Sequence, residues 1–254
     1  MNLPNPFPGI VSTVATVSQP TSTINSYKFK KAGKNGTLIT IILDESGSMN
    51  RCWDATINGF NEFVAGQRSV SADAGQGNLT LIKFDAPHIK TVFNNRPLNE
   101  VPLLDKTNYR PNGGTNLLDA IGNAIQLVNT ALAAISKKDR PGVIITIMTD
   151  GEENSSRAYT NEQIKAMVAA AEKADWTFTF LGANIDAFAV GSTFGMNAFN
   201  SVNYSIENMA DTMASVSAST TRMRFAKTAG VDTKTLYDIG LYTKEEITSM
   251  NTKK

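Results

Sequence analysis

The chain has 254 residues, 41% of them hydrophobic and 19% charged, which is typical of one soluble globular core and excludes a largely disordered chain. Its 24 basic and 23 acidic residues leave a net charge of +1, without the basic excess typical of proteins that bind nucleic acid or anionic membranes. One Cys, one His and no apolar run near ~20 residues exclude a disulfide framework, a Cys- or His-rich metal site and a membrane-spanning helix.

The first 36 residues differ in composition from the rest of the chain. They hold four of the nine prolines and four closely spaced lysines, and no acidic residue precedes Asp44. Such a segment has too little apolar periodicity to bury a face of its own, and its start lacks the basic and apolar regions of a signal peptide. Two interpretations remain open: a disordered leader, or an arm that becomes ordered by lying across a neighbouring subunit.

From residue 37 the chain alternates strands and helices. Residues 37–43 (TLITIIL) predict a strand covered on both faces, because the run is almost wholly apolar and rich in β-branched residues. Residues 79–84 and 89–93 predict two strands joined by a turn at Ala86 and Pro87. Before them, an apolar stripe with steps of four, three and four residues predicts a helix that contains Trp53, Ile57, Phe60 and Val64.

The middle of the chain continues this alternation. Apolar residues that step three and four apart over residues 118–135 predict a helix of about five turns. Residues 143–148 (VIITIM) predict a second buried strand. Thr160 and Gln163 form a capping box, which predicts that the next helix begins there.

The last third of the chain completes the pattern. Residues 176–180 and 199–204 predict two further strands, and an apolar stripe over residues 206–223 predicts a closing helix. The tail from residue 229 is expected to end in one short helix. A second capping box in this tail consists of Thr243 and Glu246.

This order of elements predicts an α/β fold with a doubly wound, mostly parallel sheet and helices on both faces. We expect residues 1–36 to form the N-terminal arm or leader, residues 37–228 the α/β domain and residues 229–254 a short helical tail. In sheets of this kind, binding sites form at the carboxyl ends of the strands. Functional side chains are therefore expected after the first and fourth strands and before the long helix.

Unusual polar residues stand at these places. Asp44, Ser46 and Ser48 follow the first strand at alternate positions. Asp150 follows the fourth strand, and Thr115 leads into the long helix after two glycines. All five side chains offer oxygen, which suits a hard divalent cation such as Mg²⁺, and Mn²⁺ accepts the same ligands. Two carboxylates balance the ion and the hydroxyls add no charge, so a position stays open for a carboxylate from another protein.

With these five residues in this order, the chain resembles the von Willebrand factor type A family and its metal-ion-dependent adhesion site. The resemblance covers about residues 37–225. It is closest to uncharacterised bacterial and phage members in the stretches 56–61, 113–121, 149–154 and 180–186. It implies a six-stranded sheet with one short antiparallel edge strand. It also implies that Ser46, Ser48 and Thr115 contact the metal, while the two aspartates act directly or through water.

Other residues near these loops allow two interpretations each. Glu152 and Glu153 either tune the ion or form a solvated first turn of a helix. Asn184 and Asp186 either line the binding face or form an Asx turn at a strand end. His88 could pair with a serine, but the sequence contains no G-x-S-x-G motif, so a catalytic triad is not expected.

The function predicted from these features is a non-catalytic, Mg²⁺-dependent protein-binding module, in which an acidic side chain of a partner protein completes the metal coordination. The alternative is a structural or accessory component of a larger assembly, such as a phage particle, attached to neighbouring subunits through residues 1–36. A metal-dependent hydrolase would need a general base, for which Glu152 is the single candidate. We expect no enzyme activity, no nucleic-acid or membrane partner, and a place in the cytoplasm or in a phage particle.

Overall fold

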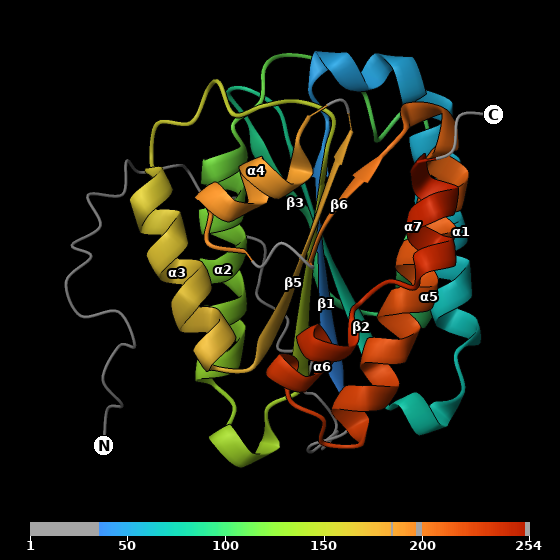
Figure 1. The fold of residues 1–254 in the computed structure, drawn as a ribbon, viewed down its shortest axis with the longest axis vertical. Helices are drawn as coiled ribbons and strands as arrows, with labels where there is room; N and C mark the ends of the chain where they lie inside the picture. The colour runs from blue at the N-terminus through green and yellow to red at the C-terminus, as the bar shows by residue number, and fades with distance from the viewer. Residues whose placement is uncertain (1–35, 184, 197–199, 252–254) are drawn as a thin grey trace.

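A six-stranded sheet stands at the centre of the computed structural model, which describes residues 36–183, 185–196 and 200–251 (Figure 1). The strand order is β3-β2-β1-β4-β5-β6. The strands are β1 (Thr37–Asp44), β2 (Gly77–Phe84), β3 (Ile89–Pro97), β4 (Gly142–Thr149), β5 (Trp176–Ala183) and β6 (Ser201–Tyr204). β2 and β3 pair antiparallel, and every other neighbouring pair is parallel. The mostly parallel α/β sheet expected from the sequence is confirmed.

The antiparallel edge strand differs from the expectation in its length. β3 has nine residues and pairs with β2 along most of that length, through the hairpin predicted at Ala86 and Pro87. The short strand is instead β6, with four residues at the opposite edge. The predicted N-terminal arm, apart from its last residue, lies outside the described residues, as does the start of the predicted sixth strand.

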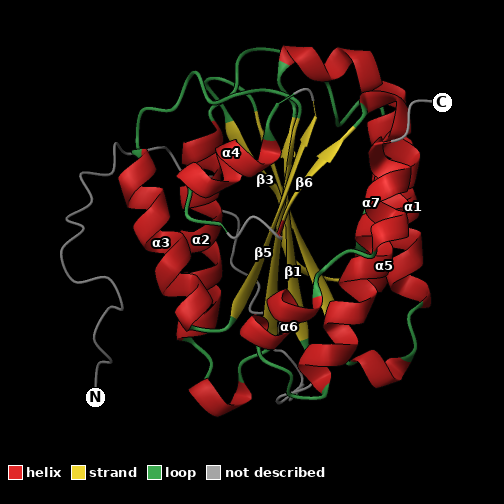
Figure 2. Ribbon diagram, viewed as in Figure 1, coloured by secondary structure: helices red, strands yellow, loops and turns green. Residues whose placement is uncertain are grey.

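Helices cover both faces of the sheet (Figure 2). They are α1 (Trp53–Ser69), α2 (Leu117–Ala133), α3 (Asn161–Lys173), α4 (Ala187–Thr193), α5 (Met209–Thr228), α6 (Thr233–Ile239) and α7 (Lys244–Asn251). Helices α2, α3 and α4 lie on one face, and α1, α5 and α7 lie on the other (Figure 1). Within the described ranges, no helix is both long and apolar enough to span a bilayer.

The apolar run of β1 explains why it is central. Successive side chains of a strand point to opposite faces, so a strand covered on both sides must be apolar throughout. Ile39 and Leu43 pack into the core beneath α1 and α5. Leu38 and Ile42 pack into the core beneath α2 and α3. All four are buried, and each such side chain stabilises the fold by roughly 1.5–3 kcal/mol.

The two capping boxes expected from the sequence both begin helices. The Thr160 hydroxyl accepts a hydrogen bond from the Gln163 backbone N–H, and the Gln163 side chain accepts one from the Thr160 N–H, at the start of α3. Thr243 and Glu246 make the same pair of bonds at the start of α7. The tail nevertheless differs from the expectation, because it holds two helices. α7 packs against α5 and β6, with Met250 fully buried.

Helix α4 has no counterpart among the predicted elements. It is only seven residues long, and its buried residues, Ala187 and Gly191, give no apolar stripe. Its start depends on Asp186, whose carboxylate accepts hydrogen bonds from the backbone N–H groups of Phe188 and Ala189. Of the two interpretations of Asp186, the turn-forming one is thus observed. Asn184 lies outside the described residues.

Candidate metal-binding site

Three loops meet at the carboxyl edge of the sheet, where β1 and β4 lie side by side. The two strands are parallel with Leu43 opposite Met148, so Asp44 and Asp150 follow them at the same edge. From here the chain leaves β1 towards β2 and leaves β4 towards β5, on opposite sides. Such a switch point opens a crevice between loops that diverge. The strand order therefore places the predicted site residues together.

Backbone contacts fix the first two loops against each other. The Gly47 N–H donates to the Gly113 carbonyl at 3.0 Å, and the Asn112 N–H donates to the Glu45 carbonyl at 2.8 Å. Gly113 has a φ of +71°, and a Cβ atom there would lie 2.5 Å from the Ala86 carbonyl oxygen. Only glycine fits this position without displacing the loop.

Four of the five predicted side chains meet at one point. The Ser46 and Ser48 hydroxyl oxygens lie 3.1 Å apart. The Ser48 hydroxyl also donates to Asp150 Oδ1 at 2.5 Å. A Cβ atom at Gly151 would lie 3.1 Å from Thr115 Oγ1 and 3.8 Å from Ser48 Oγ, so these two hydroxyls border the same small space. The residues come from three loops that are far apart in the sequence.

Asp44 stands beneath this point and is fully buried. Its Oδ1 accepts from the Ser46 N–H at 2.6 Å, and its Oδ2 accepts from the Thr149 hydroxyl at 2.5 Å. Burial raises the pKa of Asp44 from 3.8 to about 6, although hydrogen bonds from Ser46 and Thr149 partly offset the effect. The ionised carboxylate is therefore poorly compensated by its own surroundings.

Arg51 places a positive charge beside the site, and this residue was not among the predicted site residues. Its Nη2 lies 3.1 Å from Asp150 Oδ2, and its side chain is 58% exposed. Both oxygens of Asp150 are thus engaged, one by the Ser48 hydroxyl and one by this guanidinium. Among the described residues Asp44 forms no ion pair, and its hydrogen bonds come from the neutral Ser46 N–H and Thr149 hydroxyl.

The donor set is one of oxygen atoms and is rich in hydroxyls. Within the described part of the chain, no group of three or more His, Cys, Asp and Glu side chains could surround a metal ion. A cation at this edge would therefore rely on the hydroxyls of Ser46, Ser48 and Thr115 beside two carboxylates. Neutral oxygen ligands with limited negative charge fit Mg²⁺ and Mn²⁺ rather than soft metals. The residues present fit such an ion.

Glu153 has a structural role that differs from the expectation. No helix begins at Glu152 or Glu153, since α3 starts only at Asn161. The Glu153 carboxylate instead accepts hydrogen bonds from the Leu118 N–H, at the start of α2, and from both Ser155 and Ser156. An anion is favourable at a helix N-terminus, and here it ties the loop after β4 to α2. Glu152 is solvent-exposed.

Two further contacts hold the site loops, and neither was predicted. Asp119 on α2 accepts from the backbone N–H groups of three consecutive residues, 157–159, at 2.9 to 3.0 Å. The buried Tyr109 hydroxyl donates to the Asp44 carbonyl at 2.7 Å, and the Trp53 indole donates to the Tyr109 carbonyl at 2.8 Å. Aromatic and acidic side chains thus fix the backbone that presents the five donors.

His88 lies to one side of this cluster and does not contact it. Its side chain is 74% exposed, and its Nδ1 lies 2.9 Å from Asp85 Oδ1. The pair belongs to the turn between β2 and β3. It gives the site no general base.

Comparisons with known proteins identify the family and the fold. The von Willebrand factor type A domain family matches residues 39–239. No curated protein matches the chain. Proximal thread matrix protein 1 from the mussel byssus, in a structure with a zinc-occupied MIDAS motif, is 14% identical with a TM-score of 0.53, over 76% of this chain and 48% of that one.

The pilus adhesin SpaC from Lactobacillus rhamnosus GG is also similar, with 15% identity and a TM-score of 0.53 over 78% of this chain and 31% of SpaC. The chain thus spans less than half the length of these solved structures. At these identities, the likeness establishes a shared fold.

Proposed function

The chain belongs to the von Willebrand factor type A family, and from this premise we propose that it is a non-catalytic, metal-dependent protein-binding module. Asp44, Ser46, Ser48, Thr115 and Asp150 would hold one divalent cation, Mg²⁺ or Mn²⁺. The bound cation would supply positive charge and an open coordination position for an acidic side chain of a partner protein.

One observation carries this proposal above the others. Asp44 is fully buried, yet its neighbours are neutral hydroxyl and amide groups, and the pKa of its carboxyl is raised to about 6. A buried charge without a counter-charge is costly, and such strongly shifted groups gather at functional sites. A divalent cation beside Asp44 would remove that cost.

The balance of charge favours recognition of an anion. Two carboxylates neutralise a divalent ion, and the three hydroxyls add oxygen without charge. A cation in such a shell keeps its attraction for a further carboxylate. The exposed Arg51 beside Asp150 would add to that attraction at the rim of the site.

We propose no catalytic role for the two glutamates after Asp150. Glu153 is occupied by hydrogen bonds from Leu118, Ser155 and Ser156. Glu152 is exposed, where water competes for any proton that it would abstract. The alternative of an assembly component attached through residues 1–36 stays a prediction, because that segment lies outside the described residues.

Partner capture from the native source tests the proposal. The tagged chain is used with Mg²⁺ and with EDTA, beside Ser48→Ala and the matched variant Ser69→Ala, which removes an exposed hydroxyl at the far end of α1. We expect a partner that is retained by the wild type and Ser69→Ala only with Mg²⁺, and is lost with Ser48→Ala. Retention of the same partner in EDTA, or by Ser48→Ala, would contradict the proposal.

A further inference from the structure

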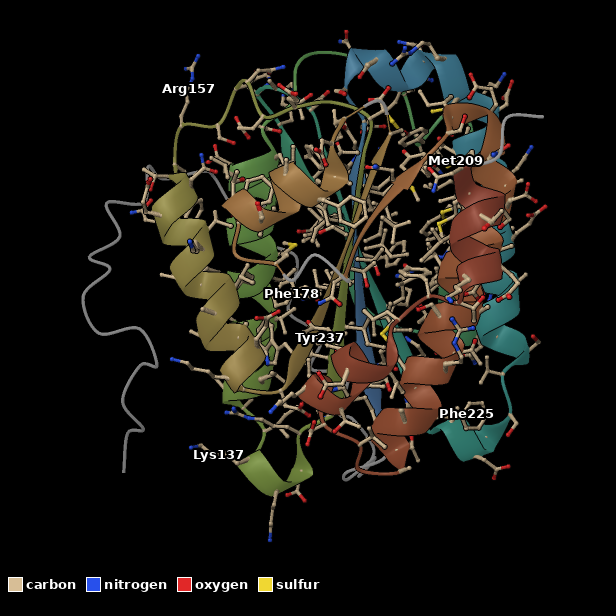
Figure 3. The ribbon with its side chains drawn as sticks, viewed as in Figure 1. Lys137, Arg157, Phe178, Met209, Phe225 and Tyr237 are labelled. Atoms are coloured by element: carbon tan, nitrogen blue, oxygen red, sulfur yellow. The ribbon has the colours of Figure 1, made fainter. Side chains whose placement is uncertain are left out.

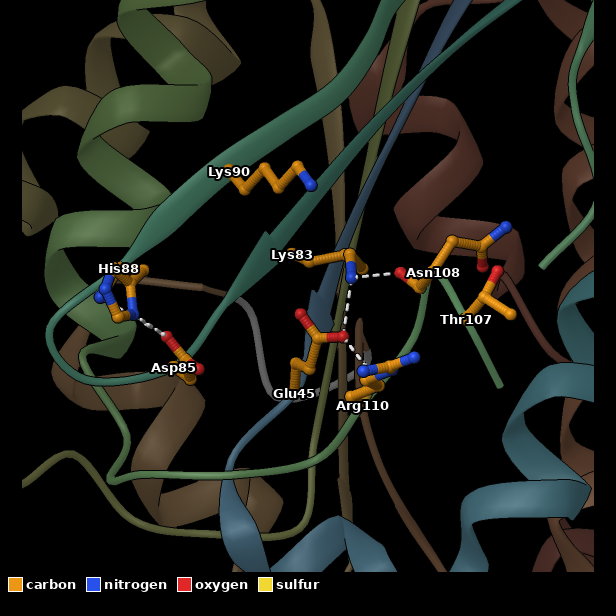
Figure 4. A pocket seen from close by; sticks show the side chains of 8 residues that line it. All are labelled: Glu45, Lys83, Asp85, His88, Lys90, Thr107, Asn108 and Arg110. Atoms are coloured by element: carbon orange, nitrogen blue, oxygen red, sulfur yellow. Dashed lines mark hydrogen bonds and ion pairs between the residues drawn. The ribbon is translucent and has the colours of Figure 1, made fainter. Parts of the chain in front are cut away.

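A pocket of about 260 Å³ adjoins the candidate metal site and shares one of its loops (Figure 4). Glu45, one of its lining residues, stands between Asp44 and Ser46 in the sequence. The Glu45 side chain lies among the pocket residues, beside Lys83 and Arg110 (Figure 4). Ser46 instead donates its N–H to Asp44, and its hydroxyl contacts that of Ser48. Residues 44–46 therefore line both the candidate metal site and the adjacent pocket.

The charges inside the pocket are largely paired. Lys83, whose side chain is 4% exposed, donates to Glu45 Oε1 and to the Asn108 carbonyl, both at 2.5 Å. The same Glu45 oxygen accepts from the Arg110 backbone N–H at 2.5 Å. Asp85 pairs with His88. The two acidic side chains are thus occupied by groups of the pocket itself.

Two cations at the pocket form no ion pair with a described residue, although Arg110 lies close enough to Asp105 to add to the hydrogen bonds that lower the pKa of that carboxyl. Neither Lys90 nor the Arg110 guanidinium forms an ion pair among the described residues, and both are exposed. The Arg110 guanidinium donates through its Nε to the Lys106 carbonyl at 2.9 Å. Three Lys and Arg side chains against two acids leave one surplus positive charge in the lining when His88 is neutral.

We propose that this pocket binds a carboxylate of the partner protein, next to the acidic side chain that reaches the metal site. Lys90 and Arg110 would contact it. A single surplus charge balances a monoanion, whereas a phosphate dianion would leave a net negative charge beside the carboxylates of Glu45 and Asp85. Two acidic groups of one partner would then be bound at the same time. This would fix the orientation of the partner as well as increase its affinity. The inference that the carboxylate belongs to the partner protein rests on the proposed function. Binding of a carboxylate in the pocket does not depend on it.

The pocket is tested alone by titrating the metal-free full chain, in EDTA, with sodium propionate as the probe. Backbone amide shifts are followed by ¹H–¹⁵N NMR against sodium chloride at equal ionic strength. We expect saturable, millimolar binding, with the largest shifts at His88, Lys90 and Arg110. Linear shifts spread over the surface, or binding that is tighter for inorganic phosphate than for propionate, would overturn the inference.

Variants assign the binding to the two cations. The double variant Lys90→Gln/Arg110→Gln should weaken propionate binding at least about fivefold. The matched double variant Lys137→Gln/Lys138→Gln removes two exposed charges at the opposite end of the molecule, where Figure 3 places Lys137, and should change nothing. Equal effects of the two double variants would contradict a local site.

Metal binding separates this inference from the proposed function. Mn²⁺ affinity of Lys90→Gln/Arg110→Gln should equal that of the wild type, and its affinity for the captured partner should fall about threefold to tenfold. If Mn²⁺ binds but propionate does not, the pocket inference fails and the metal site stands. If propionate binds but Mn²⁺ does not, the proposed function fails and the pocket stands.

Discussion

Two buried charges at opposite ends of the sheet, Lys227 and Asp44, are compensated differently. At the amino end, the buried Lys227 ammonium donates to the Asp175 carbonyl at 2.9 Å, to Asp175 Oδ2 at 3.0 Å and to the Thr233 hydroxyl at 2.6 Å. All three of its protons are used. At the carboxyl end, Asp44 and Asp150 are buried, and the exposed Arg51 pairs with Asp150 but not with Asp44.

This difference suits a structural role for Lys227 and the proposed functional role for Asp44. Burial lowers the pKa of Lys227, and the nearby Asp175 raises it again. Burial is the main reason that the pKa of Asp44 is raised to about 6, and the neighbouring Asp150 contributes a smaller part of the increase. The Lys227 ammonium is therefore fully hydrogen-bonded within the chain. Within the ranges described, Asp44 lacks such a counter-charge, which is the feature that the proposed cation would supply.

Removing the charge of Asp44 should give the largest effect. The Asp44→Asn variant is expected to lower Mn²⁺ affinity about 100-fold or more, because a neutral amide cannot balance the ion. Its free energy of unfolding in EDTA should stay within about 1 kcal/mol of the wild type, since the buried charge is uncompensated there. Calorimetric titration and urea unfolding measure the two quantities. Asp54→Asn, an exposed change on α1, is the control.

Removing the charge of Lys227 should give the opposite pattern. Lys227→Met keeps the apolar stem and deletes the ammonium, so Thr233 and the half-exposed Asp175 each lose one hydrogen-bond donor. We expect a loss of about 2 kcal/mol in the free energy of unfolding. Mn²⁺ affinity should not change. A weakened metal site in this variant, but not in the exposed control Lys138→Met, would mean that the two ends are coupled.

Arg51 should give the smallest effect, and with the opposite sign. The Arg51→Gln variant frees one oxygen of Asp150, so Mn²⁺ affinity should rise about threefold to fivefold, the size of an exposed ion pair. Arg157→Gln removes a charge at the same end of the molecule (Figure 3) and should leave the affinity nearly unchanged. If affinity falls in Arg51→Gln, the arginine assists the ion rather than competing with it.

Most of the fold followed from local patterns. Continuous apolar runs marked β1 and β4, and the three-and-four spacing marked α1 and α2, because each reflects burial of a defined face. The meeting of Asp44, Ser48 and Asp150 followed from the rule that parallel strands end at a common edge. These inferences needed no knowledge of contacts between distant segments.

What escaped prediction depends on such distant contacts. Glu153 reads as a solvated residue in sequence, yet it caps α2, which begins 36 residues earlier at Leu117. In the sequence Tyr109 is an aromatic residue in a loop, but in the structure its hydroxyl donates a hydrogen bond to the Asp44 carbonyl. Arg51 is not part of the Asp44, Ser46 and Ser48 motif that precedes it, and it pairs with Asp150 because the strand order brings the two loops together. In each case, the partner lies on another loop.

Crystals grown with MnCl₂ and measured at the manganese absorption edge test the central claim most directly, because anomalous scattering locates the ion. The expected result is one peak within about 2.5 Å of Ser46, Ser48 and Thr115 oxygens, adjacent to Asp44 and Asp150, with Arg51 displaced from Asp150. A peak elsewhere, or an empty carboxyl edge at saturating Mn²⁺, would contradict the metal-dependent account.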